Sequence, residues 1–543
     1  MSEPTASAQA PLTAPLTMSC DVLVVGGGIN GAGIARDLAG RGLKVVLCEQ
    51  DDLGAHTSSS STKLVHGGLR YLEYYEFGLV RKALAERERL LKSAPHIMWP
   101  LRFMMPHDPS MRPVWMVRIG LFLYDHLAKR EWLPGSRAVK LREHVTGAPL
   151  KPQYTRGFVY SDGWVDDARL VVLNAVDAAA HGATILTRCR CEKAERTAGG
   201  WRATLQPAGG VAIKVQARAM VNAAGPWTGE FLRDRARVQS VRALRLVKGS
   251  HIVVKKIFAH DHAYIFQNPD KRIIFAIPYE GDFTLIGTTD VEIDGAPDSA
   301  RIDADEINYL CEQASRYFTQ PVLPGDVVWA YSGVRPLLDD ESGDPSAVTR
   351  DYLLEFDDGP PEAPGGPNPA PLLSIWGGKI TTFRKLAEEA ADQVVQRLGE
   401  RRPAWTETAL LPGGDLSAWI GPPQRPDTDI RRFVQALAQR HPQLSVAVRE
   451  RWARCYGSRV ALLLGEPGAG QHGLGHEVAP GLFEVELDYL HQHEWARSVD
   501  DVLWRRTKLG LHLTAAERAQ VARWWAARHP DLQNEGTPES ACN

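Results

Sequence analysis

The chain has 543 residues, of which 44% are hydrophobic and 24% are charged, and its formal net charge is -2. This length exceeds what one hydrophobic core usually organises, so the sequence predicts two or three domains. The composition is that of a globular protein, and the near-neutral charge excludes nucleic acid from the expected partners. No uninterrupted apolar run approaches the roughly 18 residues of a membrane-spanning helix, which leaves attachment to a membrane surface open.

The seven cysteines are too few and too scattered for a disulfide framework, so we expect a reducing compartment, the cytoplasm. Cys189 and Cys191 form a C-x-C pair, but no second pair of ligands lies at zinc-site spacing, so we expect no metal. Residues 1–19 lack the basic start and apolar stretch of a signal peptide and are expected to form a disordered tail. Residues 526–543 are expected to form a second disordered tail.

The first ordered elements form a strand, a helix and a second strand. Residues 21–25 are an apolar run that ends in glycines, residues 29–41 carry apolar residues at helical density, and residues 44–49 (KVVLCE) are a second apolar run. A unit of this kind implies a parallel sheet and therefore an α/β fold. Residues 76–92 place their apolar side chains mainly on one helical face, which predicts an amphipathic surface helix.

The second half of the chain changes character twice. Residues 151–324 are rich in β-branched and aromatic runs between turns, which predicts a mixed sheet over a catalytic cavity. Residues 357–371 (DDGPPEAPGGPNPAP) predict an exposed loop, because proline removes hydrogen-bond donors and glycine raises the ordering cost. After the LPGG at residues 411–414, the apolar spacing within residues 430–437 predicts a separate helical C-terminal domain.

A nucleotide-binding turn follows the first strand. Residues 26–31 (GGGING) fit G-x-G-x-x-G between a strand and a helix, the context this motif requires. Gly26 makes the tight turn, Gly28 lets the backbone approach a pyrophosphate, and Gly31 lets the helix pack closely on the strand. Glu49 ends the second strand, where its carboxylate can accept bonds from ribose hydroxyls. The set predicts a dinucleotide site.

The segment after Glu49 favours FAD over NAD. Residues 57–63 (TSSSSTK) supply a hydroxyl-rich turn, and residues 65–68 (VHGG) add glycines, neither of which an NAD enzyme needs here. A solvated loop is the alternative interpretation of the serine run. The expected cofactor contacts in this segment are Ser59, Ser60, His66, Gly67 and Gly68.

An ordered series of motifs runs through the whole chain. The motifs are GGGINGAGIARDLAGRG (26–42), SSSTKLVHGGLRYLEYYEFGLV (59–80), YSDGWVDDARL (160–170), NAAGPW (222–227), KGSHIVV (248–254), IGTTD (286–290), YSGVRPLLDDES (331–342), GGKITTFRKLAE (377–388) and WRRTK (504–508). This series resembles the FAD-dependent, quinone-linked (aerobic) glycerol-3-phosphate dehydrogenases of the glycine-oxidase-like flavoprotein group. The resemblance covers about residues 20–525, and only the N-terminal tail and the loop at 357–371 depart from it.

The resemblance implies the domain organisation. A Rossmann-like FAD-binding domain and a mixed-sheet substrate (cap) domain interleave within residues 20–410, and an all-α C-terminal domain covers residues 411–525. The FAD-binding part is expected mainly at 20–95, 155–250 and 325–395, and the substrate part mainly at 96–154 and 250–325.

The resemblance also implies the reaction: C2 of sn-glycerol 3-phosphate gives a hydride to flavin N5, dihydroxyacetone phosphate forms, and a membrane quinone receives the electrons. A second copy of the chain, in a homodimer, is a further expected partner.

Three other functions stay open on the sequence. They are a glycerol-3-phosphate oxidase that reduces oxygen, an amine or amino-acid oxidase on the same fold, and a flavin-binding regulatory protein.

The resemblance assigns roles to residues beyond the nucleotide turn. His251 is the expected general base, since an imidazole titrates near neutrality, and Arg335 is expected to bind phosphate or developing oxyanion charge. A structural role for the histidine and a solvated surface for the cations are the alternatives. His66 is the residue to examine if FAD were covalently attached. Further expected substrate contacts are Arg70, Tyr71, Lys379 and Thr382, and further expected cofactor contacts are Ala224, Gly225, Gly378, Lys379, Ile380 and Thr381.

Residues 98–127 interleave Trp, Phe, Met and Leu with arginines. Such a surface could enter acyl chains while arginine meets anionic headgroups, although a buried core explains the same residues equally well. The resemblance favours the first interpretation, and we therefore expect peripheral attachment to the cytoplasmic face of the cell membrane.

Overall fold

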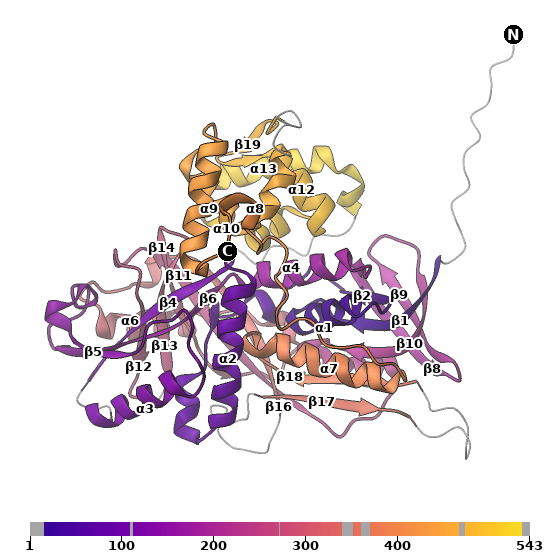
Figure 1. The fold of residues 1–543 in the computed structure, drawn as a ribbon, viewed down its shortest axis with the longest axis horizontal. Coiled ribbons are helices and arrows are strands. Elements are labelled where there is room, and N and C mark those ends of the chain that lie inside the picture. Colours follow the sequence, from indigo (N-terminus) through magenta and orange to yellow (C-terminus); the bar gives the residue numbers. More distant parts are fainter. Residues whose placement is uncertain are drawn as a thin grey trace, which may run out of the picture.

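The computed structural model describes residues 16–108, 112–270, 272–338, 351–359, 370–465 and 473–534. These residues form two large β-sheets, and the C-terminal helices, coloured orange to yellow in Figure 1, pack above them. Most of the predicted loop at 357–371 lies outside the described residues.

The first sheet carries the predicted strand–helix–strand unit. Within the described residues its order is β17-β18-β10-β1-β2-β7, and β8 and β9 continue it as a hairpin on β10. Strands β18, β10, β1, β2 and β7 run parallel, as predicted. The strands are β1 (Leu16–Val25), β2 (Val45–Cys48), β7 (Thr184–Leu186), β8 (Cys189–Thr197), β9 (Gly200–Pro207), β10 (Ile213–Asn222), β17 (Tyr352–Asp357) and β18 (Leu372–Gly377).

Helices α1 (Ile29–Gly40), α4 (Asp167–Ala180) and α7 (Phe383–Arg397) cover one face of this sheet. Their apolar side chains, among them Leu38, Leu173 and Leu386, share one core with the central strands. Burial of this common face holds the carboxyl ends of β1, β2 and β10 in fixed positions. The loops that follow these strands can therefore form a rigid site.

The second sheet is mixed, as predicted. Strand β12 runs parallel to β4, and the other strand pairs of this sheet are antiparallel. Its order in the described chain is β15-β11-β14-β13-β12-β4-β6-β3, with β16 on β11 and β5 on β6. The strands are β3 (Leu64–Val65), β4 (Met98–Pro106), β5 (Arg137–Lys140), β6 (Arg156–Val165), β11 (Leu244–Lys255), β12 (Ala263–Gln267), β13 (Ile273–Tyr279), β14 (Phe283–Gly287), β15 (Val291–Glu292) and β16 (Val327–Leu338).

The boundary between the two sheets differs from the predicted domain ranges. Strands β3, β6 and β16 fall in ranges predicted for the FAD-binding domain, yet they pair in the second sheet. Their partners lie far away in the chain, and local patterns of apolar residues do not specify such pairing. The two units therefore share more of the chain than the sequence indicates.

The C-terminal region is helical, with a small two-stranded sheet that the all-α prediction lacked. Phe433, Trp452 and Tyr456 are fully buried in its own core. Its elements are α8 (Ser417–Ile420), α9 (Pro426–Arg440), α10 (Val446–Tyr456), α11 (Ala461–Leu464), β19 (Glu477–Ala479), β20 (Leu482–Phe483), α12 (Glu484–Glu494), the π-helix η11 (Asp501–Arg506) and α13 (Ala515–Arg528).

Parts of both predicted tails belong to regular elements. Residues 16–19 extend β1, because they pair in register with the first residues of β10. At the other end α13 continues to Arg528, where the sequence prediction already placed a tail. Residues 1–15 and 535–543 lie outside the described residues.

The apolar and basic stretch at residues 98–127 divides into two elements with opposite environments. Strand β4 is mostly buried between β6 and β12, so this half is core. Helix α3 (Val114–His126) instead exposes Trp115 to 61% and Phe122 to 57%. The other helices that pack on the second sheet are α2 (Phe77–Ser93), α6 (Ala304–Tyr317) and the 3-10 helix η2 (Leu69–Tyr74), and the short α5 (Thr228–Glu230) follows β10.

Candidate functional site

One large cavity, with a volume of about 420 Å³, collects residues from both sheets. It extends from the loop after β1, past the turns after β2 and β10, to the amino end of α7. Strands β11 and β16 of the second sheet form its opposite wall. The cavity therefore lies where the carboxyl ends of parallel strands meet a second domain, which is the usual place for a ligand in such folds.

The glycine loop at the start of α1 is closely packed. Gly26 has a φ of +109°, and a Cβ there would come within 2.4 Å of the carbonyl oxygen of Ala223. A Cβ on Gly31 would lie 1.9 Å from the carbonyl oxygen of Gly26. Gly28 caps α1 and has no side chain to bond the helix, while Ser58 Oγ accepts from the backbone N–H of Ile29 at 3.0 Å. The amino end of the helix lines the cavity, where its dipole suits an anion.

Glu49 closes the nucleotide turn from the side. Its carboxylate accepts hydrogen bonds from the backbone N–H of Gly27 at 2.6 Å and of Asp51 at 2.9 Å. Burial raises the pKa of this carboxyl, and the charge of His56 and the backbone bonds oppose that rise. A carboxylate has lone pairs beyond these two bonds, so it can still accept from ribose hydroxyls.

The far end of the cavity is also formed by backbone. Gly377 and Gly378 have φ values of +72° and +102° and lead into α7, whose N-cap, Thr382, makes no side-chain cap bond. Gly225, after β10, would place a Cβ in open space. A glycine cradle with the amino end of a helix on each side suits an elongated cofactor that carries a pyrophosphate at one end and a ring that gains negative charge at the other. These residues fit FAD.

His251 is 1% exposed on β11, next to the cavity. Its Nε2 lies 2.9 Å from Thr62 Oγ1, and its ring stacks on Tyr331 with centroids 4.9 Å apart. Burial, then the charges of Arg335 and Lys63, hold the pKa of His251 well below its ordinary value. The imidazole is therefore neutral and able to accept a proton.

Arg335 lies on β16, opposite β11, and is held in a fixed orientation. Its guanidinium pairs with Asp290 and donates to Thr288 Oγ1 at 2.9 Å. The planar fork is thereby oriented along the cavity wall beside His251. Such a fixed donor suits binding of an oxyanion.

Two further cations reach the cavity from other elements. Arg70 lies on η2, and Lys379 precedes α7 with its Nζ 3.7 Å from the centre of the Tyr71 ring. All three residues line the cavity. Positive charge from η2, α7 and β16 thus converges on one space, as binding of a phosphate dianion requires.

Most of the predicted site residues line this cavity, and four do not. Gly31 packs α1 against the loop, Ser59 bonds its own turn through its hydroxyl and carbonyl, Gly67 faces Leu84 and Tyr124, and Thr382 is 1% exposed behind Ile380. The predicted residues that line the cavity are Gly26, Gly28, Glu49, Ser60, His66, Gly68, Arg70, Tyr71, Ala224, Gly225, His251, Arg335, Gly378, Lys379, Ile380 and Thr381.

Several residues at the site were not singled out from the sequence. Thr62 contacts His251, Tyr331 stacks on it, and Thr288 with Asp290 orients Arg335. All of them lie in the quoted motifs: Thr62 in the motif at 59–80, Thr288 and Asp290 in IGTTD, and Tyr331 in YSGVRPLLDDES. The motifs signalled the positions, but only folding shows which side chain meets which.

Cys48, Cys189 and Cys191 also line the cavity. Burial raises the pKa of Cys189 to about 11 and that of Cys191 to about 12, so both remain protonated thiols near neutral pH.

Comparison with known proteins agrees with this geometry. The family described as FAD dependent oxidoreductase matches residues 21–358, and the family described as C-terminal domain of alpha-glycerophosphate oxidase matches residues 404–527. Glycerol-3-phosphate dehydrogenase of Pseudomonas aeruginosa is 50% identical over 95% of this chain and 97% of its own length. D-erythritol 1-phosphate dehydrogenase of Brucella abortus is 50% identical over 93% and 98%. Aerobic glycerol-3-phosphate dehydrogenase of Escherichia coli is 48% identical over 93% and 97%.

Solved structures agree as well. Glycerol-3-phosphate dehydrogenase of Bacillus halodurans, in complex with FAD, has a TM-score of 0.74 at 28% identity and covers 95% of this chain and 93% of its own. Glycine oxidase of Geobacillus kaustophilus, at 19% identity and a TM-score of 0.51, covers 72% of this chain and 98% of its own and shows the fold alone. The predicted α/β fold and the predicted cofactor class are confirmed. The chain belongs to the family of FAD-dependent glycerol-3-phosphate dehydrogenases.

Proposed function

We propose that this protein oxidises sn-glycerol 3-phosphate at C2 to dihydroxyacetone phosphate and passes the two electrons to a membrane quinone. The observation that carries the proposal is a neutral, buried histidine beside a fixed arginine, in a cavity that also holds Arg70 and Lys379. FAD, when bound, supplies the acceptor for the hydride of C2.

His251 takes the hydroxyl proton in this proposal. The Nδ1 atom is shielded and has no hydrogen-bond partner among the described residues, whereas Nε2 lies beside the hydroxyl of cavity-lining Thr62. A substrate hydroxyl that replaces the Thr62 hydroxyl would meet the Nε2 lone pair. The C2–H pair leaves as hydride, the O–H proton goes to Nε2, and the C2 carbonyl remains.

Arg335 and the two outer cations divide the remaining tasks. Arg335, next to His251, stabilises the negative charge that develops on the C2 oxygen. Arg70 and Lys379 bind the phosphate, and the Tyr71 ring packs against the Lys379 ammonium group. Binding of the remote phosphate orients C2, which converts binding energy into correct alignment for hydride transfer.

The quinone and the membrane are proposed from another part of the cavity wall. There Phe103, Ile265 and Phe275 form an apolar wall, and η2 joins the cavity to α3.

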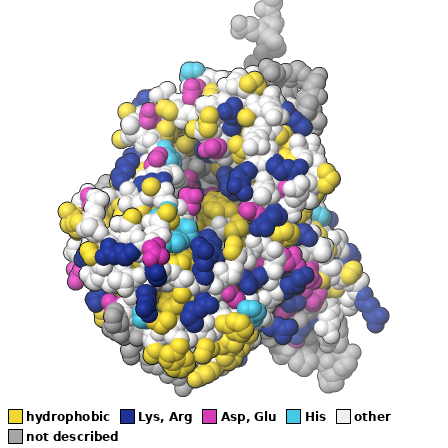
Figure 2. Space-filling model, turned by 60° about the vertical axis from the view of Figure 1, so that its left-hand side comes forward, with side chains coloured by type: hydrophobic (Ala, Val, Ile, Leu, Met, Phe, Trp, Pro, Cys, Tyr) yellow, Lys and Arg dark blue, Asp and Glu magenta, His cyan; other side chains and the backbone are white. Residues whose placement is uncertain are grey.

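The exposed apolar residues of α3 and its neighbours form a continuous yellow area at the lower edge of Figure 2, with dark-blue basic side chains above it. Among the described residues, no helix combines the length and apolar character that crossing a bilayer requires. Such a surface suits shallow insertion with basic groups at the headgroups, on the cytoplasmic face.

D-erythritol 1-phosphate is a second candidate substrate. The chain is 50% identical to the Brucella abortus enzyme named for that substrate, and 50% identical to the Pseudomonas aeruginosa enzyme. D-erythritol 1-phosphate presents the same phosphate and a longer polyol. Steady-state kcat/KM with a soluble quinone separates the two substrates. We expect the higher value for sn-glycerol 3-phosphate; a higher value for the tetritol phosphate reverses the assignment, and activity with neither rejects the function.

A further inference from the structure

The WRRTK segment at residues 504–508 belongs to the C-terminal domain, yet all its side chains except that of Thr507 contact the part of the chain that carries the two large sheets. We propose that this segment is a positioning element, through which the C-terminal domain fixes both the catalytic histidine and the turn that carries Glu49. The histidine part rests on the proposed function, whereas the FAD part does not. Three sets of contacts carry the proposal.

An aromatic column connects the segment to His251. Trp504 stacks on Trp329 with centroids 4.8 Å apart, Trp329 lies 5.0 Å from Tyr331, and Tyr331 stacks on His251 at 4.9 Å. Trp329 and Tyr331 are two residues apart on β16, so they share a face of the strand. The C-terminal domain thereby packs, through Trp504 and Trp329, against the Tyr331 ring that covers the imidazole of His251.

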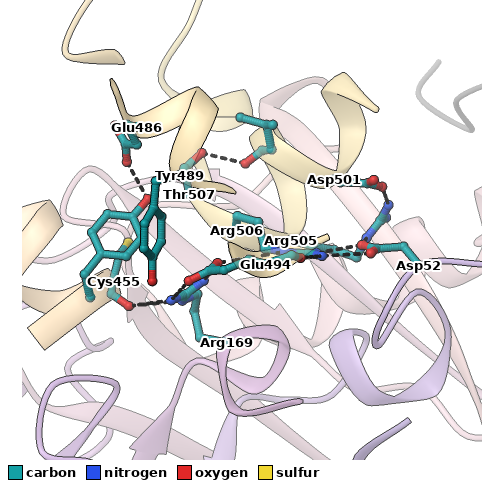
Figure 3. Close-up of polar contacts among 12 residues, drawn as sticks. Asp52, Arg169, Cys455, Glu486, Tyr489, Glu494, Asp501, Arg505, Arg506 and Thr507 are labelled. Atoms are coloured by element: carbon teal, nitrogen blue, oxygen red, sulfur yellow. Dashed lines mark hydrogen bonds and ion pairs between the residues drawn. The ribbon is translucent and has the colours of Figure 1, made fainter. Parts of the chain in front are cut away.

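A pair of arginines holds the turn after β2. Arg506 donates to both carboxylate oxygens of Asp52, at 2.6 and 2.8 Å, and Arg505 Nε donates to the same carboxylate at 2.6 Å. Figure 3 shows the two guanidinium groups converging on Asp52 from the C-terminal domain. Burial opposes ionisation of Asp52, but the charges of Arg506 and Arg505 hold its pKa below the ordinary value. This carboxylate is therefore charged and firmly held.

The turn that Asp52 anchors is part of the nucleotide site. Glu49 accepts from the backbone of Asp51 at 2.9 Å, and Gly54 N donates to the carbonyl of Gly27 at 3.1 Å. Gly54 and Ala55 also line the cavity. A shift of Asp52 would move the Glu49 carboxylate and the glycine loop together, because all of them are tied into one short turn.

Lys508 makes the third connection. Its Nζ lies 3.1 Å from Asp166, and the next residue, Asp167, pairs with Lys63 at 2.8 Å. Lys63 is buried, with its Nζ 5.1 Å from the centre of the Tyr331 ring, and its charge helps to hold the pKa of His251 down. The first connection acts through packing and this one through charge, and both end at the same imidazole.

The first experiment tests the aromatic column by anaerobic reduction of the bound flavin with sn-glycerol 3-phosphate across pH. In Trp504→Leu the cover over His251 loosens and its pKa rises, so the acid limb of the rate profile moves up by about one pH unit. Trp504→Phe keeps a stacking ring and should keep the wild-type limb. Trp524→Leu is the matched control, a half-buried tryptophan of the same domain that does not reach the site. An acid limb in Trp504→Leu that equals wild type, or a shift of the same size in Trp524→Leu, overturns the proposal.

The second experiment tests the arginines without any substrate. Release of FAD from the diluted holoenzyme, followed by flavin fluorescence, gives the affinity of Arg506→Lys, which cannot grip Asp52 with a planar fork. We expect binding about tenfold weaker than wild type. Arg451→Lys is the control, since Arg451 makes the same two-pronged buried pair with Glu486 inside the C-terminal domain. Wild-type affinity in Arg506→Lys, or an equal loss in Arg451→Lys, contradicts the proposal even if sn-glycerol 3-phosphate proved not to be the substrate.

Discussion

His251 owes its chemistry to its surroundings. The imidazole is covered by Tyr331 and faces Arg335 and Lys63, so burial and two positive charges all disfavour its protonated form. A base of this kind is available over a wide range of pH, because the neutral form persists below the ordinary value of 6.5. In the proposed reaction this lowered affinity for the proton is a cost, which the adjacent arginine would offset by stabilising the oxygen that loses the proton.

Replacement of this base is the first prediction. His251→Asn should slow flavin reduction by sn-glycerol 3-phosphate by about 10²- to 10⁴-fold, the usual contribution of a general base. Wild-type reduction should stay constant as the pH falls through 6.5 and decline only below it, since a lowered pKa keeps the imidazole neutral. Stopped-flow absorbance measures both. A variant with wild-type rates, or a wild-type decline centred above pH 6.5, would show that another group takes the proton.

Replacement of Lys379 tests where the substrate phosphate binds. Lys379→Met removes a charge that we propose to bind the phosphate, and it should raise KM for sn-glycerol 3-phosphate by about tenfold, with a smaller effect on kcat. Lys385→Met serves as the control, because Lys385 pairs with Glu388 on α7 and does not line the cavity. Equal KM values for the two variants would move the phosphate away from Lys379.

Two elements place the cofactor, and both depend on the absence of a side chain. The amino end of α1 can approach the loop after β1 only because Gly31 has no Cβ, and the entry to α7 uses glycines with positive φ. Gly31→Ala should weaken FAD binding strongly and lower the midpoint of thermal unfolding, since the new Cβ would lie 1.9 Å from the Gly26 carbonyl oxygen and backbone cannot move aside as a flexible side chain can. Gly78→Ala in α2, where a Cβ meets nothing within 4 Å, should do neither. Normal FAD binding by Gly31→Ala would refute this account of the loop.

Helix α3 is the element we connect with the membrane. The double variant Trp115→Ser and Phe122→Ser removes its two most exposed aromatic side chains and should abolish binding to vesicles of anionic phospholipid, while flavin reduction in solution is unchanged. Val446→Ser with Leu462→Ser, on exposed sites of the C-terminal domain, should leave vesicle binding intact. Cosedimentation decides between them: vesicle binding that survives loss of the two aromatic residues would assign the membrane surface to another face.

Across the whole molecule, the sequence predicts the local elements, but it does not predict which distant segments come into contact. The strand and helix around residues 21–41 and the amphipathic helix α2 follow from glycine spacing and apolar periodicity, so they were predictable. The pairing of β3 with β6 and the column from His251 to Trp504 join segments distant in the chain, and no local pattern encodes them. Ordered motifs identified most of the cavity wall, but the partners that orient each side chain emerged only from the fold.

The same long-range organisation makes the molecule one catalytic unit. The first sheet contributes the glycine loop, the second contributes His251 and Arg335, and the WRRTK segment of the C-terminal domain contacts both parts. Such an arrangement resembles other sites formed at a junction between domains, where binding of the ligand depends on all the parts at once.

Every role proposed above requires that the cavity bind FAD together with a phosphorylated secondary alcohol that reduces it. The most direct test of this requirement is anaerobic mixing of the FAD-loaded protein with one equivalent of sn-glycerol 3-phosphate, with free glycerol and glycine as controls, while the visible flavin absorbance is recorded. We predict rapid bleaching by the phosphate ester alone and formation of dihydroxyacetone phosphate in equal amount to the reduced flavin. A flavin that stays oxidised with the phosphate ester, or that glycine bleaches equally fast, would contradict the account.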